Sequence, residues 1–393
     1  MPKKLTAWLL TGFWLVTTTL GSLAFKIPTT VSTVLIVSFL VCALVSDRFN
    51  PQSRARNSKV PTGAYVVITT VVSLQILSAS FAGFDIRDRL PLFGLVLFCA
   101  ALLSLIDKNQ VLRGFYNAGI LLAIAGWPIE ILKLNSWHLE SGYSSYFLGW
   151  RWMGLQSHPN LAGMTMAMIF GLALLHFRNR VVAFMCLFSL AFSEHRGGMI
   201  AVGLLLAYWT IKRFRSWAPI KKFSAAGLWS LLAVSLPQLL VARTGEDDIT
   251  TGRVQIWQLC VGRIQSNSTF GLGPNAITRQ FGQDTTSSLN PFHCHNQLMD
   301  DLVNFGFFGG VLPTIVVFVA AVAAVRRGNT LLIPIFFVAI ACWFIESPFR
   351  LFSGEPNTFL NMLFLFALVN VYEVNLFKKR DWAQSLAHST NII

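Results

Sequence analysis

The sequence predicts an all-α polytopic membrane protein with about twelve transmembrane helices, and three observations lead to this fold class. Of the 393 residues, 54% are hydrophobic and only 12% are charged, whereas soluble domains carry about a quarter charged residues. The mean hydropathy is +0.58. Apolar stretches long enough to cross about 30 Å of hydrocarbon recur along the chain, and the basic residues between them favour one side of the membrane.

The apolar stretches divide the chain into spans joined by mostly short connections, all within one membrane domain, residues 1–393. The seventh and eighth spans are short. The connection at 48–59 carries proline and reads as a turn-rich loop. The expected spans are about residues 5–23, 29–46, 63–81, 90–106, 114–132, 158–176, 180–194, 197–212, 224–241, 297–325, 329–346 and 356–373.

Charge placement supports twelve spans with both termini in the cytoplasm. In that topology 20 of the 31 Lys and Arg residues face the cytoplasm, with 4 of the 17 acidic residues. The cytoplasmic side then carries +16 and the external side −2, which is the usual bias of membrane proteins. The pI of 9.9 therefore reflects topology and not nucleic-acid binding. Lys3 and Lys4 before the first apolar run leave a cleaved signal peptide as an alternative.

The longer of two extended external segments is the loop of about 242–296, which we expect to contribute to the active site. The other, about 133–157, is rich in aromatic residues that favour the headgroup level of the membrane. Residues 253–264 predict a short amphipathic helix lying over the membrane, with a turn at 271–275 and a polar stretch at 283–290 after it. The apolar residues at helical spacing in this helix are Val254, Trp257, Val261 and Ile264.

Four groups of polar residues fall on the external side in this topology. An arginine near the hydrocarbon boundary is costly unless it is paired or faces a cavity. Several arginines beside a histidine would form a cationic pocket for a diphosphate, because guanidinium groups bind phosphate oxygens bidentately. The groups are Arg151 with His158-Pro159-Asn160, Glu194-His195-Arg196, Gly252-Arg253 with Trp257, and His293-Cys294-His295-Asn296.

Each of these residues also has a structural explanation. The arginines could anchor the chain at the interface or solvate a loop or helix. The histidines and Asn296 could begin helices as capping residues. Glu346 and Arg350, at the outer end of the eleventh span, are further candidates for the site.

Cysteine and metal chemistry are the remaining alternatives for the loop. Cys260 and Cys294 are the two cysteines in it, and a disulfide between them is possible in an oxidising compartment. Cys294 as a nucleophile has only its flanking histidines in its favour. The His-Cys-His run lacks the ligand spacing of a zinc site. Asp247-Asp248 or Asp300-Asp301 could hold a divalent ion beside a diphosphate, but solvation or pairing explains them as well, and we expect no metal or cofactor.

The order of these motifs resembles the O-antigen ligase and O-antigen polymerase superfamily between about residues 145 and 325. The motifs are Arg-x-x-Gly and His-Pro-Asn at 151–160, Ser-x-x-Arg-Gly at 193–197, Gly-Arg-x-x-Ile-Trp at 252–257, Gly-Leu-Gly-Pro at 271–274, His-x-His-Asn at 293–296 and Phe-Gly-Phe-x-Gly at 305–309. The resemblance implies a GT-C-like membrane glycosyltransferase of the bacterial cytoplasmic (inner) membrane. Such an enzyme works on the outer face of that membrane.

The resemblance also implies the roles of individual residues. The donor would be a glycan on undecaprenyl diphosphate, and the acceptor a sugar hydroxyl on a glycan or on lipid A core. His295 matches the histidine that acts as general base, and Arg196 and Arg253 match arginines that hold the diphosphate. Arg151 is a weaker match, and we add His293, Asn296 and Trp257 as neighbours that would bind substrate. The family needs no metal and inverts the anomeric centre.

Two questions of function stay open at this level. A polymerase and a ligase share these motifs and differ in the acceptor, and the short loop slightly favours a polymerase. A lipid-linked oligosaccharide flippase or polysaccharide transporter is the alternative class. Transporters tend to place polar residues at the mid-membrane in two matching halves, whereas here they gather on one face.

Overall fold

The structure is a computed structural model that describes most of the chain, and its regular structure is all helical within those residues. The prediction of an all-α fold is confirmed. The described residues are 2–19, 29–49, 62–83, 90–132, 151–156, 158–214, 216–242, 253–281, 294–343, 346 and 358–372.

Each of the twelve predicted spans overlaps a helix. The helices in those ranges are α1 (Pro2–Thr19), α2 (Thr29–Arg48), α4 (Thr62–Phe81), α5 (Leu90–Ser104), α6 (Lys108–Ile131), α8 (Pro159–Leu172) with a π-helical turn at Ala173–Phe177, α9 (Arg180–Ser193), α10 (Arg196–Arg213), α11 (Pro219–Ala242), α14 (Gln297–Arg326), α15 (Ile333–Trp343) and α16 (Thr358–Tyr372). Among the described residues, three helices are long and apolar enough to cross a membrane: Lys108–Ile131, Pro159–Phe177 and Gln297–Arg326. The number of spans and their orientation therefore stay predictions.

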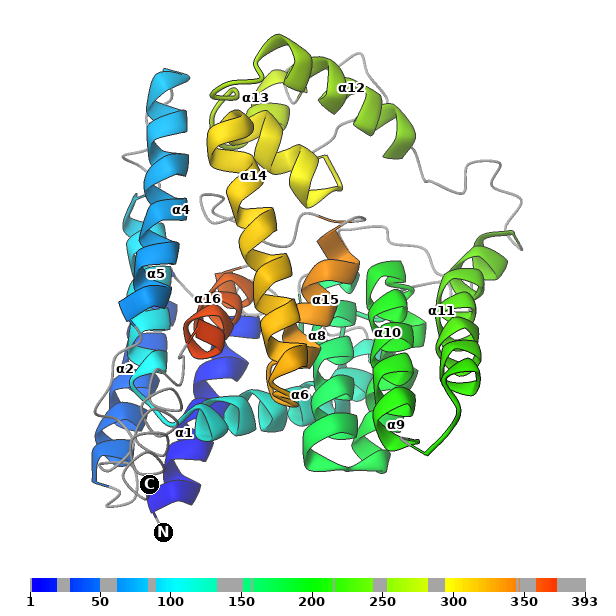
Figure 1. The fold of residues 1–393 in the computed structure, drawn as a ribbon. Helices are drawn as coiled ribbons and strands as arrows, with labels where there is room; N and C mark the ends of the chain where they lie inside the picture. The colour runs from blue at the N-terminus through cyan, green and yellow to red at the C-terminus, as the bar shows by residue number, and fades with distance from the viewer. Residues whose placement is uncertain are drawn as a thin grey trace, which may run out of the picture.

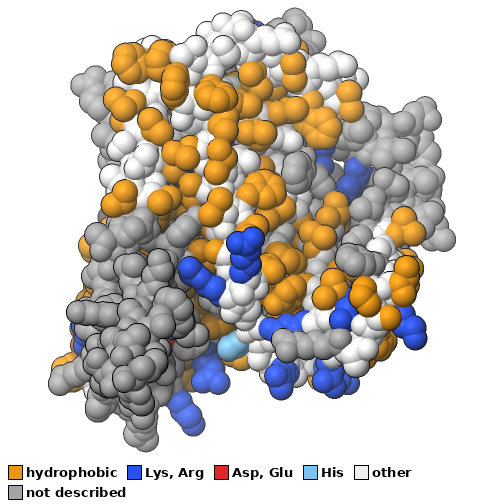
Figure 2. All heavy atoms as spheres, in the orientation of Figure 1, with side chains coloured by type: hydrophobic (Ala, Val, Ile, Leu, Met, Phe, Trp, Pro, Cys, Tyr) orange, Lys and Arg blue, Asp and Glu red, His pale blue; other side chains and the backbone are white. Residues whose placement is uncertain are grey.

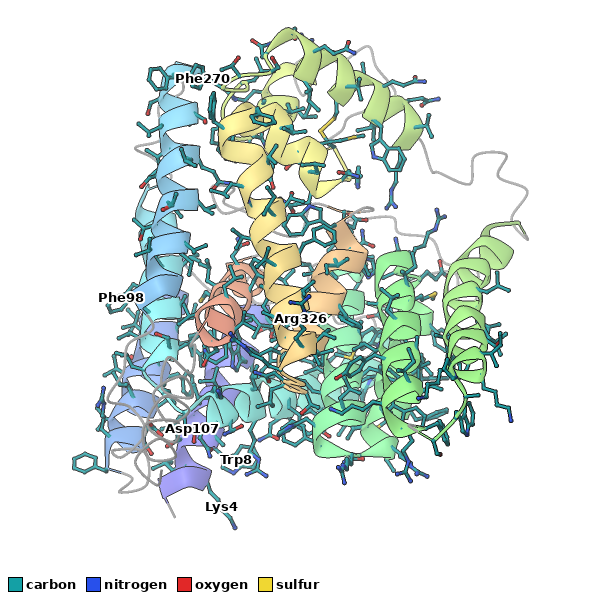
Figure 3. The ribbon with its side chains drawn as sticks, viewed as in Figure 1. Lys4, Trp8, Phe98, Asp107, Phe270 and Arg326 are labelled. Atoms are coloured by element: carbon teal, nitrogen blue, oxygen red, sulfur yellow. A yellow bond between two sulfur atoms is a disulfide. The ribbon has the colours of Figure 1, made fainter. Side chains whose placement is uncertain are left out.

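The described part of the loop predicted at 242–296, residues 253–281, forms a cap at one end of the molecule. It contains α12 (Arg253–Ser266), which confirms the predicted short helix, and α13 (Ala276–Phe281), which the sequence did not predict. Figure 1 shows both helices beside the start of α14, at the end opposite the first turn of α1. Lys4 and Phe270 mark these two ends in Figure 3.

Basic and apolar side chains occupy different parts of the surface. Figure 2 shows most of the Lys and Arg side chains in the lower half of the face, and a broad apolar surface above them. Exposed apolar residues on α14 include Ile315, Val319 and Val322, which are 49–51% exposed. An apolar surface of this extent needs a lipid environment or a partner, which agrees with an integral membrane protein.

Helix α8 is the most enclosed helix near the candidate site. All its residues except Asn160 are buried. Gly163 and Gly171 let other elements approach closely, because a Cβ at these positions would lie 2.3 Å from the Cβ of His195 and 2.6 Å from the Cβ of Pro334. Asn160, in the first turn, is therefore held at a fixed position at the end of the helix.

Helix α14 is broken at Gly306, where φ is +62° and ψ is −165°. The break frees backbone groups that an intact helix would pair, and buried groups of this kind need partners. The segment that follows α12 supplies them through backbone hydrogen bonds of 2.7–2.8 Å: Leu272 N–H to Val303 O, Gly273 N–H to Asn304 O and Phe307 N–H to Ser268 O. The loop is thereby fixed to the first part of α14.

Candidate functional site

The carboxylate of Glu346 lies at the centre of a polar cluster where α8, α12 and the start of α14 meet. Its Oε1 accepts a hydrogen bond from Arg253 Nη2 at 2.8 Å and another from Asn160 Nδ2 at 2.8 Å. Its Oε2 lies 3.3 Å from His295 Nδ1. One carboxylate therefore joins three segments that are far apart in the sequence.

Within the cluster the carboxylate is more buried than its two partners Arg253 and His295. The side chain of Glu346 is 7% exposed, that of Arg253 is 16% exposed and that of His295 is 27% exposed. Glu346 follows α15, and its backbone N–H donates to Cys342 O in the last turn of that helix at 2.7 Å. A ligand approaching from solvent would therefore meet the cationic side chain and the imidazole before the carboxylate.

Arg151 joins the cluster through Asn160. Its Nη2 donates to Asn160 Oδ1 at 2.9 Å, and its Nε donates to Ser193 O at 2.8 Å. The amide of Asn160 thus accepts from a guanidinium and donates to the carboxylate of Glu346. This relay links the two charged groups through the side chain of Asn160.

A buried glutamate fixes the segment that carries Arg151. Glu130, on α6, is 1% exposed, and its Oε2 accepts hydrogen bonds from Met153 N at 3.3 Å and Gly154 N at 3.0 Å. Trp152 is buried, and its N–H donates to Phe192 O at 2.9 Å. These contacts hold the backbone on both sides of residue 152, so the guanidinium extends from a rigid segment.

Two further histidines face the cluster as neutral helix caps. His158 Nδ1 accepts the N–H of Asn160 at 3.0 Å, and His195 Nδ1 accepts the N–H of Gly198 at 3.0 Å. Burial lowers the pKa of His158 to about 4 and that of His195 to about 3; Glu346 opposes the shift and Arg151 adds to it. Both are therefore neutral near pH 7, with the proton on Nε2 because Nδ1 accepts. The capping alternative is confirmed for both residues.

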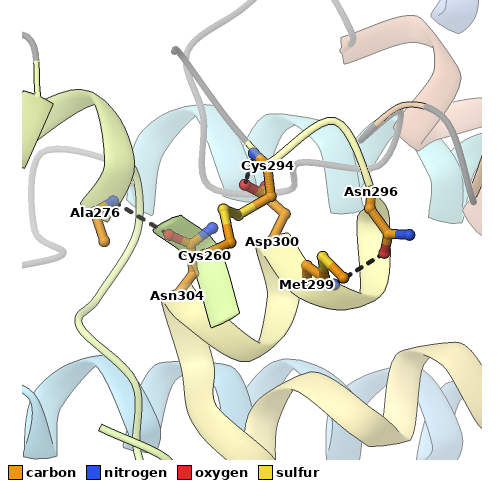
Figure 4. Close-up of a disulfide and its surroundings, with 7 residues drawn as sticks. All are labelled: Cys260, Ala276, Cys294, Asn296, Met299, Asp300 and Asn304. Carbon is orange, nitrogen blue, oxygen red and sulfur yellow. Dashed lines mark hydrogen bonds between the residues drawn. A yellow bond between two sulfur atoms is a disulfide. The ribbon is translucent and has the colours of Figure 1, made fainter. Parts of the chain in front are cut away.

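A disulfide ties α12 to the segment that carries His295. Cys260 and Cys294 are bonded, which settles the alternative left open by the sequence and excludes a free Cys294 nucleophile in this structure. Figure 4 shows the bond above the first turns of α14. Arg253 begins α12 and His295 directly follows Cys294, so the bond restricts the distance between the two site residues.

The disulfide also determines which side of α12 is packed. Ile256 and Cys260 are buried, and Ile264 packs against them. Val254 and Val261, part of the expected apolar stripe, are 42% and 39% exposed. The covalent bond at position 260 turns the 256–260 side inward and leaves the two valines facing outward.

The turn that presents His295 is held by its neighbours. His295 has φ of +49°, in the left-handed region that is rare for residues other than Gly, Asn and Asp. Asn296 caps α14 by accepting the N–H of Met299 at 3.1 Å. Asp300 Oδ1 accepts the N–H of Cys294 at 3.2 Å, as Figure 4 also shows. These bonds on both sides of residue 295 stabilise an unfavourable backbone conformation.

The described residues contain no group of three or more potential metal ligands among His, Cys, Asp and Glu. Asp300 is used in the turn, and Asp301 Oδ1 accepts from Gln297 Nε2 at 3.0 Å. The Asp247-Asp248 pair lies outside the described residues.

The other predicted site residues are placed as follows. Arg196 is partly buried at the start of α10, next to His195. Trp257 lies one turn after Arg253 on α12, and its indole Nε1 is buried without a hydrogen-bond partner in the described part of the chain. His293 and Arg350 lie outside the described residues. The structure thus brings His295, Arg253 and Arg151 into one hydrogen-bonded network.

The sequence interpretation missed two parts of this network. Asn160 was read within a motif but not as the link to Glu346, which is 186 residues away. Glu130 was not singled out, although a carboxylate near the end of an apolar helix is a signal that it serves a specific contact. Glu346 was named only as a further candidate, and it is the residue on which the cluster converges.

A family model described as O-antigen ligase matches residues 181–314, about a third of the chain. The matched region runs from α9 into α14 and includes Arg196, Arg253 and His295. No curated protein matches the chain.

Proposed function

From the premise that this chain is a member of the O-antigen ligase superfamily through residues 181–314, we propose that it is a membrane glycosyltransferase with His295 as its general base. It would transfer a glycan from undecaprenyl diphosphate to a sugar hydroxyl on the outer face of the bacterial cytoplasmic membrane. The observation that carries the proposal is the convergence of His295 and Arg253 on Glu346, 3.3 Å and 2.8 Å from its oxygens.

The chemistry requires two things of the protein. In the transfer, the acceptor oxygen bonds to the anomeric carbon, the bond from that carbon to the phosphate oxygen breaks, and the diphosphate leaves with the electron pair. Cations aimed at the developing charge lower the barrier. A base must take the acceptor proton, and imidazole exchanges protons near neutral pH. The attack would be direct, with inversion and without a metal.

The residues divide between these tasks. Arg253 shares the Glu346 carboxylate with the imidazole of His295, and we assign it to the diphosphate, with Arg196 and Arg151 as further cationic contacts. The unpartnered indole N–H of Trp257 is a donor suited to a substrate oxygen. His293 and Asn296 would contribute to substrate binding beside the base.

A narrow apolar pocket beside the start of α14 is suited to a short part of the lipid of a substrate. Its volume is about 50 Å³, and it lies between α4, α14, α15 and α16, with Val67, Val71 and Leu368 among its lining residues. Gln297 and Asp301, at the start of α14, line it as well. An isoprenoid chain whose first units enter this pocket would have its polar end close to the turn that carries His295.

The proposal is tested with purified protein in lipid vesicles supplied with a polyprenyl-diphosphate glycan. Transfer of the glycan with release of polyprenyl diphosphate supports a transferase. Movement of intact donor across the bilayer without turnover would instead identify a flippase. Deletion in the host separates the two transferase roles: accumulated single lipid-linked repeats indicate a polymerase, and accumulated full-length chains indicate a ligase.

A further inference from the structure

Glu346 holds, through one carboxylate, both the residue proposed to bind the diphosphate and the residue proposed to act as base. We propose that Glu346 is a positioning residue whose two oxygens have separate tasks. Oε1 accepts the hydrogen bond of Arg253 until a phosphate oxygen of the donor takes its place. Oε2 orients the imidazole of His295 both before and after the donor binds. This inference rests on the proposed function. In the empty site, the carboxylate of Glu346 takes the position at Arg253 that a phosphate of the donor takes when it binds.

The hydrogen-bond chemistry of Oε2 determines the tautomer of His295. A carboxylate can only accept hydrogen bonds. The contact between Oε2 and His295 Nδ1 at 3.3 Å therefore places the imidazole proton on Nδ1. In that tautomer Nε2 carries the lone pair of the neutral imidazole, and it is the ring atom that can take a proton from an acceptor hydroxyl.

The exposure of the three side chains supports an exchange at Oε1. Arg253 is more exposed than Glu346, at 16% against 7%, so an anion from solvent meets the guanidinium more readily than the carboxylate. A guanidinium has five N–H donors in a planar fork that suits phosphate oxygens. Asn160 Nδ2, 2.8 Å from Oε1, keeps a hydrogen bond on that oxygen after Arg253 has moved.

The exchange is favourable only because Glu346 keeps other partners. A buried carboxylate that loses its single counterpart is strongly destabilised. Here Asn160 and His295 remain, from α8 and from the turn before α14. The carboxylate also carries one negative charge, less than a diphosphate, so the donor competes successfully for Arg253. Arg253 is therefore paired with Glu346 when the site is empty, and it exchanges this partner for the phosphate when the substrate binds.

The substitution Glu346→Gln separates the two tasks while preserving the side-chain shape. Its amide oxygen would face the two donors, Arg253 and Asn160, and its NH₂ would face His295 Nδ1. Nδ1 must then accept, which moves the imidazole proton to Nε2 and removes the base. Removal of the competing charge should at the same time strengthen binding of an anion at Arg253.

The first experiment measures binding of inorganic diphosphate to the purified full-length protein, which does not depend on turnover. We expect Glu346→Gln to bind at least about fivefold more tightly than wild type, and Arg253→Gln to bind more weakly. Asp107→Asn is the matched control: it removes a carboxylate that caps α6, and Asn is an equally good cap. Equal or weaker binding by Glu346→Gln would overturn the exchange at Oε1.

The second experiment follows the tautomer of His295 by ¹⁵N NMR of protein with labelled histidine, assigned with the variant His295→Asn. We expect the proton on Nδ1 in wild type and on Nε2 in Glu346→Gln.

In the transfer assay the variant Glu346→Gln should lose about 100-fold in kcat without a rise in KM for the donor, and Glu346→Asp should recover part of kcat. An unchanged tautomer, or a KM raised as in Arg253→Gln, would mean that Glu346 only holds the fold together. A wild-type protein without transfer activity whose binding and tautomer results are as expected would overturn the proposed function. The exchange of Oε1 for an anion at Arg253 and the tautomer of His295 would still stand, without their catalytic meaning.

Discussion

Gly271 and Gly306 lie backbone against backbone, in the left-handed region at φ of +70° and +62°. A Cβ on Gly271 would lie 2.5 Å from the nitrogen of Gly306, and a Cβ on Gly306 would lie 2.4 Å from the oxygen of Thr269. Neither position can hold a side chain without moving a backbone. This crossing joins the loop to the break in α14, and α14 begins directly after the turn that carries His295.

We therefore expect Gly306→Ala to destabilise the folded protein by roughly 3 kcal/mol, from the strained φ together with the backbone clash. The measurement is the thermal midpoint of the purified protein in detergent. Gly262→Ala is the control, because a Cβ at this exposed position of α12 meets nothing within 4 Å and Ala favours a helix. Equal midpoints for the two variants would show that the crossing is not tight.

This crossing also shows the limit of reading the fold from sequence. The apolar runs predicted where most of the helices lie, because a helix in lipid must be apolar over its length. The turn at 271–275 was predicted from its glycines and proline. The contact between Gly271 and Gly306 could not be predicted. It depends on how two distant segments approach each other in space, and the sequence pattern around either glycine does not show this.

The disulfide between Cys260 and Cys294 should support both stability and activity. In the chain-entropy model, a bond across a sequence separation of 34 residues contributes about 3–4 kcal/mol. We expect a reducing agent to lower the thermal midpoint and to slow glycan transfer, because α12 and the turn of His295 then move independently. Thermal midpoint and transfer rate measured with and without dithiothreitol test this.

The double variant Cys260→Ser, Cys294→Ser is the control for the reducing agent. It keeps Cys42, Cys99, Cys186 and Cys342, which are free in the structure. Its midpoint and rate should already be low, and dithiothreitol should not change them. If dithiothreitol changes neither the thermal midpoint nor the transfer rate of wild type, the disulfide does not fix the positions of the site residues.

Acid should destabilise the protein through His195. The pKa of its imidazole is lowered to about 3 by burial, from an ordinary value of 6.5. A histidine with a lowered pKa in the folded state stabilises the fold fully above pH 6.5 and loses that contribution as the pH falls towards 3. Between pH 7 and pH 5 the loss is roughly 2 kcal/mol.

The variant His195→Asn tests the assignment, because Asn caps a helix but does not titrate. Thermal midpoints at pH 7 and pH 5 should fall further apart in wild type than in the variant. A fall of the same size in both proteins would show that His195 is not the group responsible.

The relay through Asn160 predicts an unequal effect of two substitutions. Asn160→Asp puts a second carboxylate beside Glu346, where the amide Nδ2 now donates at 2.8 Å. Like charges at this distance repel, so we expect Asn160→Asp to reduce kcat roughly 100-fold relative to wild type. Asn160→Ala, which adds no charge, should reduce kcat less. Transfer kinetics at constant pH provide the measurement.

Asn179→Asp is the matched control, since Asn179 caps α9 by accepting the N–H of Val182 and Asp caps equally well. The site residues themselves could be chosen from sequence, because arginine and histidine are costly near lipid. Their connection could not, because Asn160 and Glu346 are 186 residues apart. An Asn160→Asp variant as active as wild type would contradict the relay.

The role of His295 as base is the central claim, and transfer kinetics of the variant His295→Asn test it most directly. Asn tolerates the left-handed backbone of this position, so the turn is preserved, and His176→Asn, which replaces an imidazole bonded to Thr330, is the control. We expect His295→Asn to keep the thermal midpoint and the donor KM and to lose about 100-fold or more in kcat, with His176→Asn close to wild type. A folded His295→Asn protein that transfers glycan at the wild-type rate would contradict the account.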